Sequence, residues 1–388
     1  MPWKESSTLN EREKFVNSVL TENVPFSELC AQYGISRKTG YKWVERYNAD
    51  GRRGLKDQSR RPLTTTNAVG EDAIIQAITV KQKHMTWGPK KIRQVIVRNL
   101  GEAAAPSISS VHRILKKADL VKKRRIRSVN PTGRIQNRIE AKECNDVWSV
   151  DFKGWWMTRD IRKCTPLTIT DRASRMVIRV QRVDHMTTEA AQAVFESAFK
   201  EYGLPKVIRS DNGTPFATTN GLHGLSRLSV WWMSLGILPD RIDPGKPSQN
   251  GGHERMHRDL KAEVQKTVLV DLAESQAALD AWRKEFNEVR PHEAIGMQTP
   301  AEVYTPSPRK YEPFDELQYP EGFVARKVCS GGKIKLNSFK IYISSVFTGR
   351  HLGLKPVDEK TMSVWLGEFH IGNIDLSTVS FSADGVTV

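Results

Sequence analysis

Apolar positions recur at helical spacing in the first fifty residues of the chain. One stripe lies within residues 15–20 and a second begins at residues 26–33. Gly34 can then adopt a left-handed turn, and Ser36 can cap a further helix that turns Trp43 inward. Two helices joined by a short glycine turn predict a helix-turn-helix domain over residues 1–50, although bundles that bind no DNA use similar turns.

A second helical pattern follows a basic linker at residues 51–68, which we expect to be extended. Apolar stripes within 74–78, 92–96 and 108–115 predict three more helices. Gly88-Pro89 begins the second of these, and Ser107 caps or precedes the third. We therefore expect a second helix-turn-helix domain over residues 69–121, followed by another basic linker at 122–143.

The pattern changes to strands and helices in turn over residues 144–302. WSVDF ends a strand-like run, and residues 165–183 read as two strands joined by a turn at 171–174. A helical stripe at 190–199 ends near Gly203, and KVIRSDNG is a short strand that enters a turn. GKPSQNGGHERMHRDLKAEVQK opens a long helix. This order predicts a mixed sheet flanked by helices.

Short alternating runs punctuated by Gly and Asn fill residues 321–388, after a Pro-rich linker at 303–320. They predict a small antiparallel all-β barrel or sandwich. Lys333, Lys335 and Lys340 near its first hairpin favour a DNA-binding or interface role over that of a stabilising cap. The fold class we expect is therefore multidomain, with helical modules, an α/β core and a C-terminal β barrel.

The charge of the chain is concentrated at one end. Its 388 residues carry a formal net charge of +16, of which residues 1–140 supply +15 and the remainder +1. A phosphate polymer is the expected partner of the basic part, because Lys and Arg displace condensed counterions. The alternative is a basic surface that serves solubility only.

Other partners are less favoured by the composition. No apolar run approaches the length of a membrane span, so we expect no membrane role and a cytoplasmic protein. We expect no small-molecule substrate. The four cysteines are scattered without a CxxC pair and are expected to be reduced.

The candidate DNA-binding residues are basic or hydroxyl side chains on the predicted outer helix faces and in the linkers. In the first domain and its linker they are Ser36, Arg37, Lys38, Thr39, Lys42, Arg46, Arg52, Arg53, Arg60 and Arg61. In the second domain and its linker they are His112, Arg113, Lys116, Lys117, Lys122, Lys123, Arg124, Arg125 and Arg127.

Three carboxylates stand where predicted elements end or expose one face: Asp151, Asp211 and Glu254. On the long helix, residues 256, 260 and 264 fall on a core stripe, whereas Glu254, Arg258 and Lys261 fall on an adjacent face. Mg²⁺ prefers such hard oxygen ligands, and two ions can serve phosphoryl transfer. Structural roles, as helix caps or salt-bridge partners, would account for these three acidic residues equally well.

WSVDFKG, SDNGTPF and NGGHERMHRDLK together resemble the catalytic core of the DDE transposases of bacterial insertion sequences, in the retroviral-integrase superfamily. The resemblance covers residues 8–375 and implies a ribonuclease-H-like fold with Asp151, Asp211 and Glu254 as catalytic residues and ligands of two Mg²⁺ or Mn²⁺ ions. It also implies that Arg258 and Lys261 approach the DNA end.

Two departures qualify this resemblance. The second and third acids are separated by 42 residues, more than the commonest integrase spacing, and Glu263 is the nearest rival for the third position. The N-terminal part has no His-His-Cys-Cys pattern, so we predict no zinc; His84 and His112 are expected to be surface or core residues.

The resemblance implies a transposase that binds the terminal inverted repeats, cleaves the 3′ end and joins the freed 3′-OH to target DNA. Its partners would be double-stranded DNA at both element ends and at the target, and further copies of the chain in a dimer or higher multimer. The resemblance also implies a bacterial protein associated with the nucleoid. Three alternatives stay open: a regulator that has lost catalysis, a ribonuclease-H-type nuclease, and a structural protein that organises DNA.

Overall fold

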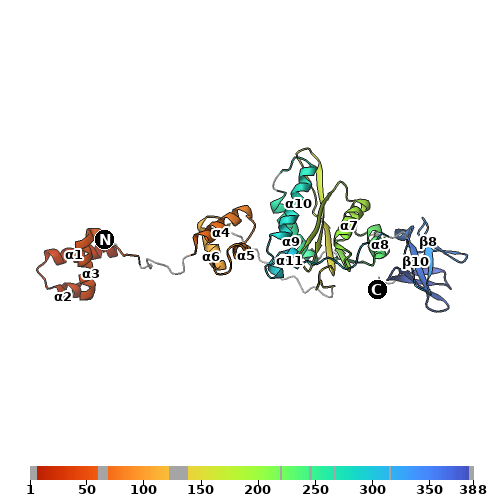
Figure 1. Cartoon of the computed structure of the whole chain (residues 1–388). Helices are drawn as coiled ribbons and strands as arrows, with labels where there is room; N and C mark the ends of the chain where they lie inside the picture. Colours follow the sequence, from red (N-terminus) through yellow and green to blue (C-terminus); the bar gives the residue numbers. More distant parts are fainter. Residues whose placement is uncertain are drawn as a thin grey trace, which may run out of the picture. The chain divides into compact units, whose positions relative to one another are not determined.

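The computed structural model describes residues 7–59, 69–121, 139–218, 221–243, 247–265, 268–313 and 316–383. The chain forms two compact units, residues 1–68 and 69–388, which are described separately (Figure 1).

The first unit is helical. It contains α1 (Thr8–Thr21), α2 (Phe26–Gln32) and α3 (Arg37–Asp50). Gly34 adopts a positive φ of 62° between α2 and α3, and the Ser36 side chain accepts a hydrogen bond from the Thr39 amide, so both turn predictions are confirmed. Phe15, Leu29 and buried Trp43 join the three helices in one core.

The chain directly after α3 is folded rather than extended, contrary to our expectation. Gly51–Leu55 form the 3₁₀ helix η1, and Leu55 is fully buried in the core of the first unit. The Arg12 guanidinium donates to the Leu55 carbonyl over 2.8 Å. Gly54 permits this close packing, because a Cβ there would lie 2.0 Å from the Arg46 carbonyl oxygen.

The second unit begins with another three-helix group. It consists of α4 (Glu71–Lys83), α5 (Pro89–Leu100) and α6 (Ile108–Lys117). The Ser107 side chain caps α6 by accepting from the Ser110 amide. Trp87, Ile92 and Val111 belong to its buried core, whose residues come from all three helices and the turn after α4.

A mixed sheet forms the centre of the second unit. Its strands are β1 (Val147–Phe152), β2 (Trp156–Met157), β3 (Lys163–Asp171), β4 (Val177–Val183), β5 (Val207–Ser210) and β6 (Leu238–Arg241). The order is β2-β3-β1-β5-β6, with β4 on β3. The β1, β3 and β4 pairings are antiparallel, whereas β5 runs parallel to both β1 and β6.

Helices cover both faces of this sheet, which confirms the predicted layers (Figure 1). They are α7 (Thr188–Tyr202), α8 (Arg227–Ser234), α9 (Gly251–Glu263), α10 (Leu272–Glu288) and α11 (Pro300–Val303), with short 3₁₀ turns η2 (Leu222–Gly224), η3 (Pro247–Asn250) and η4 (Glu293–Ile295).

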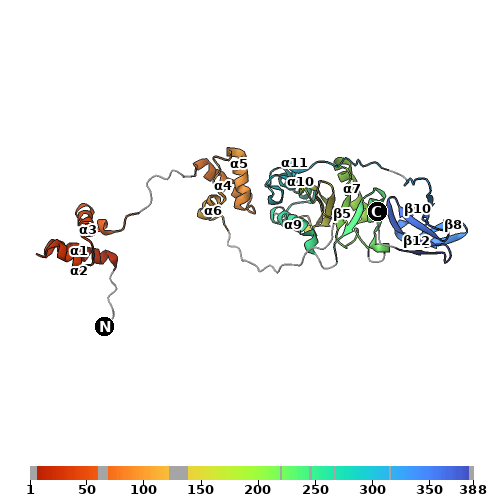
Figure 2. The same ribbon diagram turned by 90° about the horizontal axis from the view of Figure 1, so that it is seen from below.

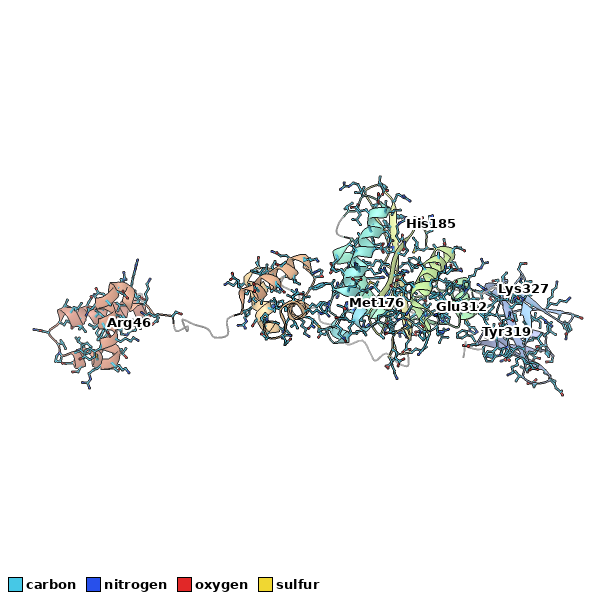
Figure 3. All side chains as sticks on the ribbon, viewed as in Figure 1. Arg46, Met176, His185, Glu312, Tyr319 and Lys327 are labelled. Atoms are coloured by element: carbon cyan, nitrogen blue, oxygen red, sulfur yellow. The ribbon has the colours of Figure 1, made fainter. Side chains whose placement is uncertain are left out.

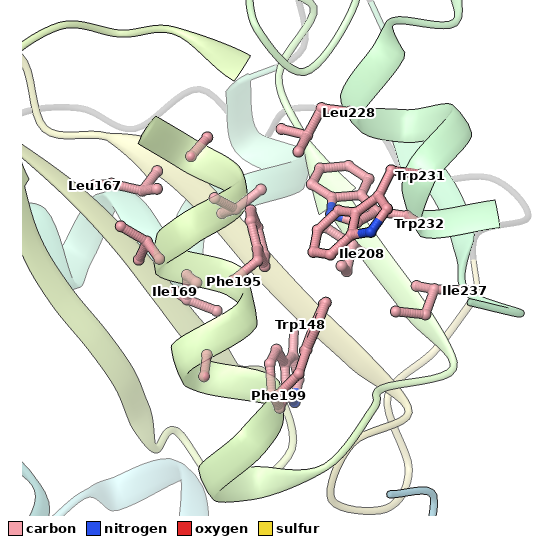
Figure 4. Close-up of a cluster of buried hydrophobic side chains, with 14 of the residues drawn as sticks. Trp148, Leu167, Ile169, Phe195, Phe199, Ile208, Leu228, Trp231, Trp232 and Ile237 are labelled. Carbon is pink, nitrogen blue, oxygen red and sulfur yellow. The ribbon is translucent and has the colours of Figure 1, made fainter. Parts of the chain in front are cut away.

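The two faces of the sheet have separate cores. Figure 4 shows Trp148 and Ile208 of β1 and β5 packed with Phe195 and Phe199 of α7 and Trp232 of α8. The opposite core joins strand residues to α9 and α10. Because α9 packs across β1 and β3, its side chains reach the strand that carries Asp151.

The C-terminal part consists of strands, as Figure 2 shows for β8, β10 and β12. Its elements are β7 (Val324–Lys327), β8 (Lys333–Leu336), β9 (Phe339–Tyr342), η5 (Ser345–Phe347), β10 (His351–Pro356), β11 (Thr361–Leu366), β12 (Phe369–Asp375) and β13 (Ser380–Ser382).

An antiparallel sheet of order β13-β12-β11-β10-β7 organises this part, and the β8–β9 hairpin contacts both edge strands. Within residues 316–383 the strand pairing itself does not close into the expected barrel. Tyr319, labelled in Figure 3, ties the segment before β7 to the sheet through its hydroxyl, which contacts the carbonyls of His351 and Trp365.

Candidate active site

Asp151 and Asp211 follow the same edge of the central sheet. Strands β1 and β5 are parallel, with Val147 opposite Val207 and Ser149 opposite Arg209. The same offset of sixty residues relates Asp151 to Asp211. Neighbouring strands lie about 4.8 Å apart, so this register brings the two carboxylates to adjacent positions at the carboxyl ends of the strands.

A tight turn holds Asp211 directly after β5. Its Oδ1 accepts from the Gly213 amide over 3.0 Å, and the Asn212 side-chain amide donates to the Ile242 carbonyl over 2.7 Å. The predicted strand-to-turn junction is therefore confirmed. It fixes the Asp211 backbone to the chain after β6 and leaves the side chain half-buried.

Glu254 lies in the first turn of α9, and its side chain is exposed. Met256, Leu260 and Val264 are buried, as the helical pattern predicts. Arg258 and Lys261 are exposed on the neighbouring face. The helix thus presents a carboxylate near its positive end and cations further along, in the order that the sequence indicates.

The three carboxylates interact electrostatically. Burial raises the pKa of Asp151 to about 7, and the negative charge of Asp211, with a smaller effect from Glu254, adds to this rise. The Lys153 ammonium is also close: burial and the charge of Lys261 lower the pKa of Lys153, and the Asp151 carboxylate partly offsets this decrease. Burial and the neighbouring acids thus make an ionised Asp151 unfavourable, and a bound divalent cation would relieve this.

Two histidines of α9 contribute to the site although the sequence reasoning did not select them. His253 and His257 are buried, and the Nε2 atom of each lies 2.7 Å from the Thr168 hydroxyl of β3. The Nδ1 atom of His253 lies 2.9 Å from the Thr170 hydroxyl. These contacts join α9 to the strand paired with β1.

Both imidazoles are neutral. Burial lowers the pKa of His257 to about 3, with a further contribution from Lys153. Burial and the neighbouring His257 hold the pKa of His253 well below its ordinary value. The spacing of the two residues could have revealed them, because positions 253, 256, 257 and 260 form one continuous inward stripe on a helix.

Nitrogen and oxygen atoms of three of these residues converge. One carboxylate oxygen of Asp151 and one ring nitrogen each of His253 and His257 lie within 4.8 Å of one another. The His257 Nδ1 atom is 3.6 Å from Asp151 Oδ2. This group is a candidate metal centre at the end of β1.

Glu263, the rival for the third acidic position, has structural partners instead. Its carboxylate accepts from the indole of Trp282 over 2.8 Å and from the buried guanidinium of Arg290 over 3.2 Å. Arg290 also binds Asp259 over 2.6 Å. These contacts fasten α9 to α10 and its C-terminal end.

The candidate DNA-binding residues of the two helical domains lie at their surfaces. In α3, Ser36, Arg37, Lys38 and Lys42 are exposed, whereas Thr39 and Arg46 are partly buried. Lys42 and Arg46 lie over the ring of Trp43, so part of this basic face is also packed on the core.

The remaining candidates divide between exposed positions and positions outside the described residues. Arg52 and Arg53 are exposed, with Arg52 paired to Glu13 over 3.1 Å. The exposed candidates of α6 are His112, Arg113, Lys116 and Lys117. Seven predicted residues lie outside the described part of the chain: Arg60, Arg61, Lys122, Lys123, Arg124, Arg125 and Arg127.

Comparisons with known families match the domains that these observations define. Residues 141–247 and 235–300 match the integrase core domain. Residues 11–62 match a helix-turn-helix domain, and residues 39–115 match a homeodomain-like domain.

Proteins of two bacterial insertion elements are similar over a larger part of the chain. An uncharacterized 39.2 kDa protein of insertion element IS476 from Xanthomonas euvesicatoria is 25% identical over 64% of this chain and 69% of its own length. An uncharacterized 31.7 kDa protein of insertion element IS407 from Burkholderia multivorans is 27% identical over 60% of this chain and 81% of its own length.

Among solved structures, the HTLV-2 integrase catalytic core domain aligns with 43% of this chain and 100% of that chain, at 18% identity and a TM-score of 0.34.

The chain therefore carries an integrase core domain preceded by helix-turn-helix domains. Its resemblance to the transposases of bacterial insertion sequences is confirmed, since its relatives include proteins of insertion elements. No helix in the described ranges is long and apolar enough to cross a membrane.

Proposed function

We propose that this chain is a DNA transposase that cleaves the 3′ ends of an insertion sequence and joins them to target DNA in a metal-dependent reaction. The observation that carries the proposal is the convergence of charge at the end of β1, where partial burial raises the pKa of Asp151 and the charges of Asp211 and Glu254 raise it further. Such crowding within an integrase core domain supports a site for cations and phosphate rather than a set of structural caps.

The residues at this site fit divalent cations. Asp151, Asp211 and Glu254 offer hard carboxylate oxygens, and both burial and the charges of the other two acids disfavour an ionised Asp151 unless a cation is bound. We infer that these acids would hold Mg²⁺ or Mn²⁺, two ions per site. When bound, such ions activate the attacking oxygen and stabilise the leaving oxygen of a phosphodiester.

The protein's own groups position the DNA. Lys153 lies close enough to both Lys261 and Asp151 for their charges to affect its pKa, so these two ammonium groups would bind phosphate oxygens beside the scissile bond. Arg258, one turn after Glu254, extends this cationic face along α9. No covalent enzyme intermediate is needed, because the freed 3′-OH is itself the next nucleophile.

The helical domains would supply recognition of the terminal inverted repeats. The exposed basic side chains near the start of the capped helices α3 and α6 support this role, because the first turns of such a helix enter the major groove in helix-turn-helix proteins. Arg37 and Lys38 lie in the first turn of α3, and His112 and Arg113 lie in the second turn of α6, whereas Lys116 and Lys117 lie in its last turn. Joining two ends requires at least two copies of the chain, so we expect a dimer or higher multimer on DNA.

We also infer that the C-terminal β domain forms a DNA or subunit interface. The β8–β9 hairpin contacts both edge strands of the sheet. Lys333, Lys335 and Lys340 are exposed on it beside Tyr342, which is 56% exposed. Cations interleaved with aromatic rings suit a nucleic-acid surface.

A strand-transfer assay tests the proposal. The substrate is a pre-cleaved oligonucleotide duplex with the inverted repeat that flanks the coding region, and the reaction contains Mg²⁺ or Mn²⁺. We expect the wild-type chain to join this end to target DNA and Asp151→Asn to abolish joining while repeat binding persists. Asp184→Asn is the matched control, because this exposed carboxylate pairs with Arg182 over 2.7 Å outside the site.

The alternatives give different results in the same assay. Repeat binding without joining by the wild-type chain would identify a regulator that has lost catalysis. Cutting without joining would identify a nuclease. Binding without preference for the repeat and without metal dependence would identify a structural protein that organises DNA.

A further inference from the structure

The hydroxyl of Thr168 can satisfy its contacts in only one way. It donates its single hydrogen to the Asp151 carbonyl over 2.8 Å. The two ring nitrogens that lie 2.7 Å from the same oxygen, Nε2 of His253 and Nε2 of His257, must therefore carry hydrogens and donate to it. The tautomer of each neutral ring is fixed by this arrangement.

The hydrogen-bonding capacity of His253 is then fully used. Its Nε2–H donates to Thr168, and its Nδ1 lone pair accepts from the Thr170 hydroxyl over 2.9 Å. No nitrogen lone pair of this ring remains to bind a ligand. Although His253 lies within 4.8 Å of the other members of the candidate metal group, its role is to fasten α9 to β3.

His257 differs at its second nitrogen. Its Nε2–H is committed to Thr168, so the Nδ1 atom carries a lone pair, and this atom lies 3.6 Å from Asp151 Oδ2. Two electron-rich atoms thus face each other beside the carboxylates. A separation of 3.6 Å is too long for a hydrogen bond, but it suits two ligands that each bind one ion at about 2.1 Å.

We propose that His257 Nδ1 is a nitrogen ligand of the divalent cation held by Asp151, so that this site binds its metal through mixed nitrogen and oxygen atoms. The inference rests on the proposed function, because it assumes a cation at Asp151. It adds a ligand from α9 three residues after Glu254, on the buried rather than the exposed face of the helix.

The added nitrogen has a consequence for metal selectivity. Sites made only of carboxylate oxygens suit Mg²⁺, whereas imidazole shifts preference toward Mn²⁺ and later transition metals. Thr168 acts as a second-sphere partner that orients the ring, since ligating histidines characteristically engage their other nitrogen in a hydrogen bond. The metal bound at this site should therefore be Mn²⁺ in preference to Mg²⁺ at equal concentrations.

Electron spin-echo spectroscopy of Mn²⁺ bound to the full-length chain tests the ligand directly. Coordination by an imidazole nitrogen produces a ¹⁴N modulation that carboxylate ligands do not. We expect this modulation in the wild-type chain and its loss in His257→Gln, whose amide N–H can still donate to Thr168. His253→Gln is the matched control and should keep the modulation.

Binding affinity gives a second measurement. Loss of partners outside the ligand sphere typically weakens metal binding 10–100-fold, so removal of a direct ligand should weaken Mn²⁺ binding at least ~10-fold. Mg²⁺ binding should change less. If circular dichroism shows that His257→Gln does not fold, His257→Asn takes its place in both measurements.

Three outcomes would overturn the inference. Mn²⁺ bound without ¹⁴N modulation, together with intact strand transfer, would refute the His257 ligand and leave the proposed function standing. If His253→Gln loses the modulation and His257→Gln keeps it, the nitrogen ligand is His253 and not His257. Mn²⁺ binding that is absent, or unaffected by Asp151→Asn, would refute both the ligand and the metal-dependent function.

Discussion

Replacement of Asp151 by asparagine should stabilise the metal-free protein while it abolishes strand transfer. The substitution preserves the shape of the side chain and removes a charge that is unfavourable at this position. Burial, Asp211 and Glu254 raise the pKa of Asp151 to about 7 in the folded chain, against an ordinary value of 3.8. The folded state therefore binds the Asp151 proton more tightly than the unfolded state does.

The sign and size of the effect follow from proton linkage. Well below pH 3.8 the Asp151 carboxyl is protonated in both the folded and the unfolded state and does not affect stability. The destabilisation of the folded state grows as the pH rises above 3.8 and reaches its full value above about pH 7. At 1.36 kcal/mol per pKa unit, the full difference corresponds to about 4 kcal/mol at pH 8 and about 1.5 kcal/mol at pH 5. Because the side chain is 28% exposed, we expect about 2–4 kcal/mol at pH 8.

Thermal unfolding of the core domain, followed in EDTA at pH 5 and pH 8, measures this effect. Asp151→Asn should raise Tm at pH 8 by at least ~4 °C and by less at pH 5. Saturating Mn²⁺ should stabilise the wild-type chain and leave the variant nearly unchanged. If the rise in Tm at pH 8 is equal to or smaller than the rise at pH 5, folding does not raise the pKa of Asp151.

Asp171→Asn is the control for this experiment. Asp171 is also buried with a raised pKa, but its carboxylate accepts hydrogen bonds from the Asn145 amide and from the amide and hydroxyl of Ser174. An asparagine cannot accept all of these bonds, so this variant should be less stable than the wild type at both pH values.

Three further predictions concern other parts of the chain. Gly54→Ala should destabilise the first unit by more than ~2 kcal/mol, measured by its thermal transition, because the new Cβ would lie 2.0 Å from the Arg46 carbonyl oxygen. Glu263→Gln should destabilise the core by about 1–3 kcal/mol in chemical denaturation, since buried Arg290 loses a charged acceptor, yet a folded fraction should still join DNA ends. Lys116→Ala should weaken binding to the repeat and should lower the slope of log Kd against log salt concentration by about 1. An unchanged slope would show that Lys116 of α6 does not contact DNA phosphates.

Local signals were sufficient for much of the fold. Ser36 and Ser107 cap helices and Gly34 takes a left-handed turn, because such features depend on residues within one turn of the chain. The inward stripe of α9 was equally readable from helical periodicity. The 3₁₀ turn that buries Leu55 was missed, because a stretch rich in Gly and Arg gives no periodic signal and its packing depends on distant Arg12.

The three candidate carboxylates were selected from motif and spacing, and the exposed face of α9 with Glu254, Arg258 and Lys261 was predicted from helical periodicity. The histidine pair could be placed on the inward side of the helix in the same way, but nothing in the linear chain pairs it with Thr168 and Thr170. Those contacts span 83 to 89 residues and exist because β3 lies antiparallel to β1 beneath α9. A polar group buried by such long-range packing acquires its role from the partners that the fold brings to it, and no local propensity encodes them.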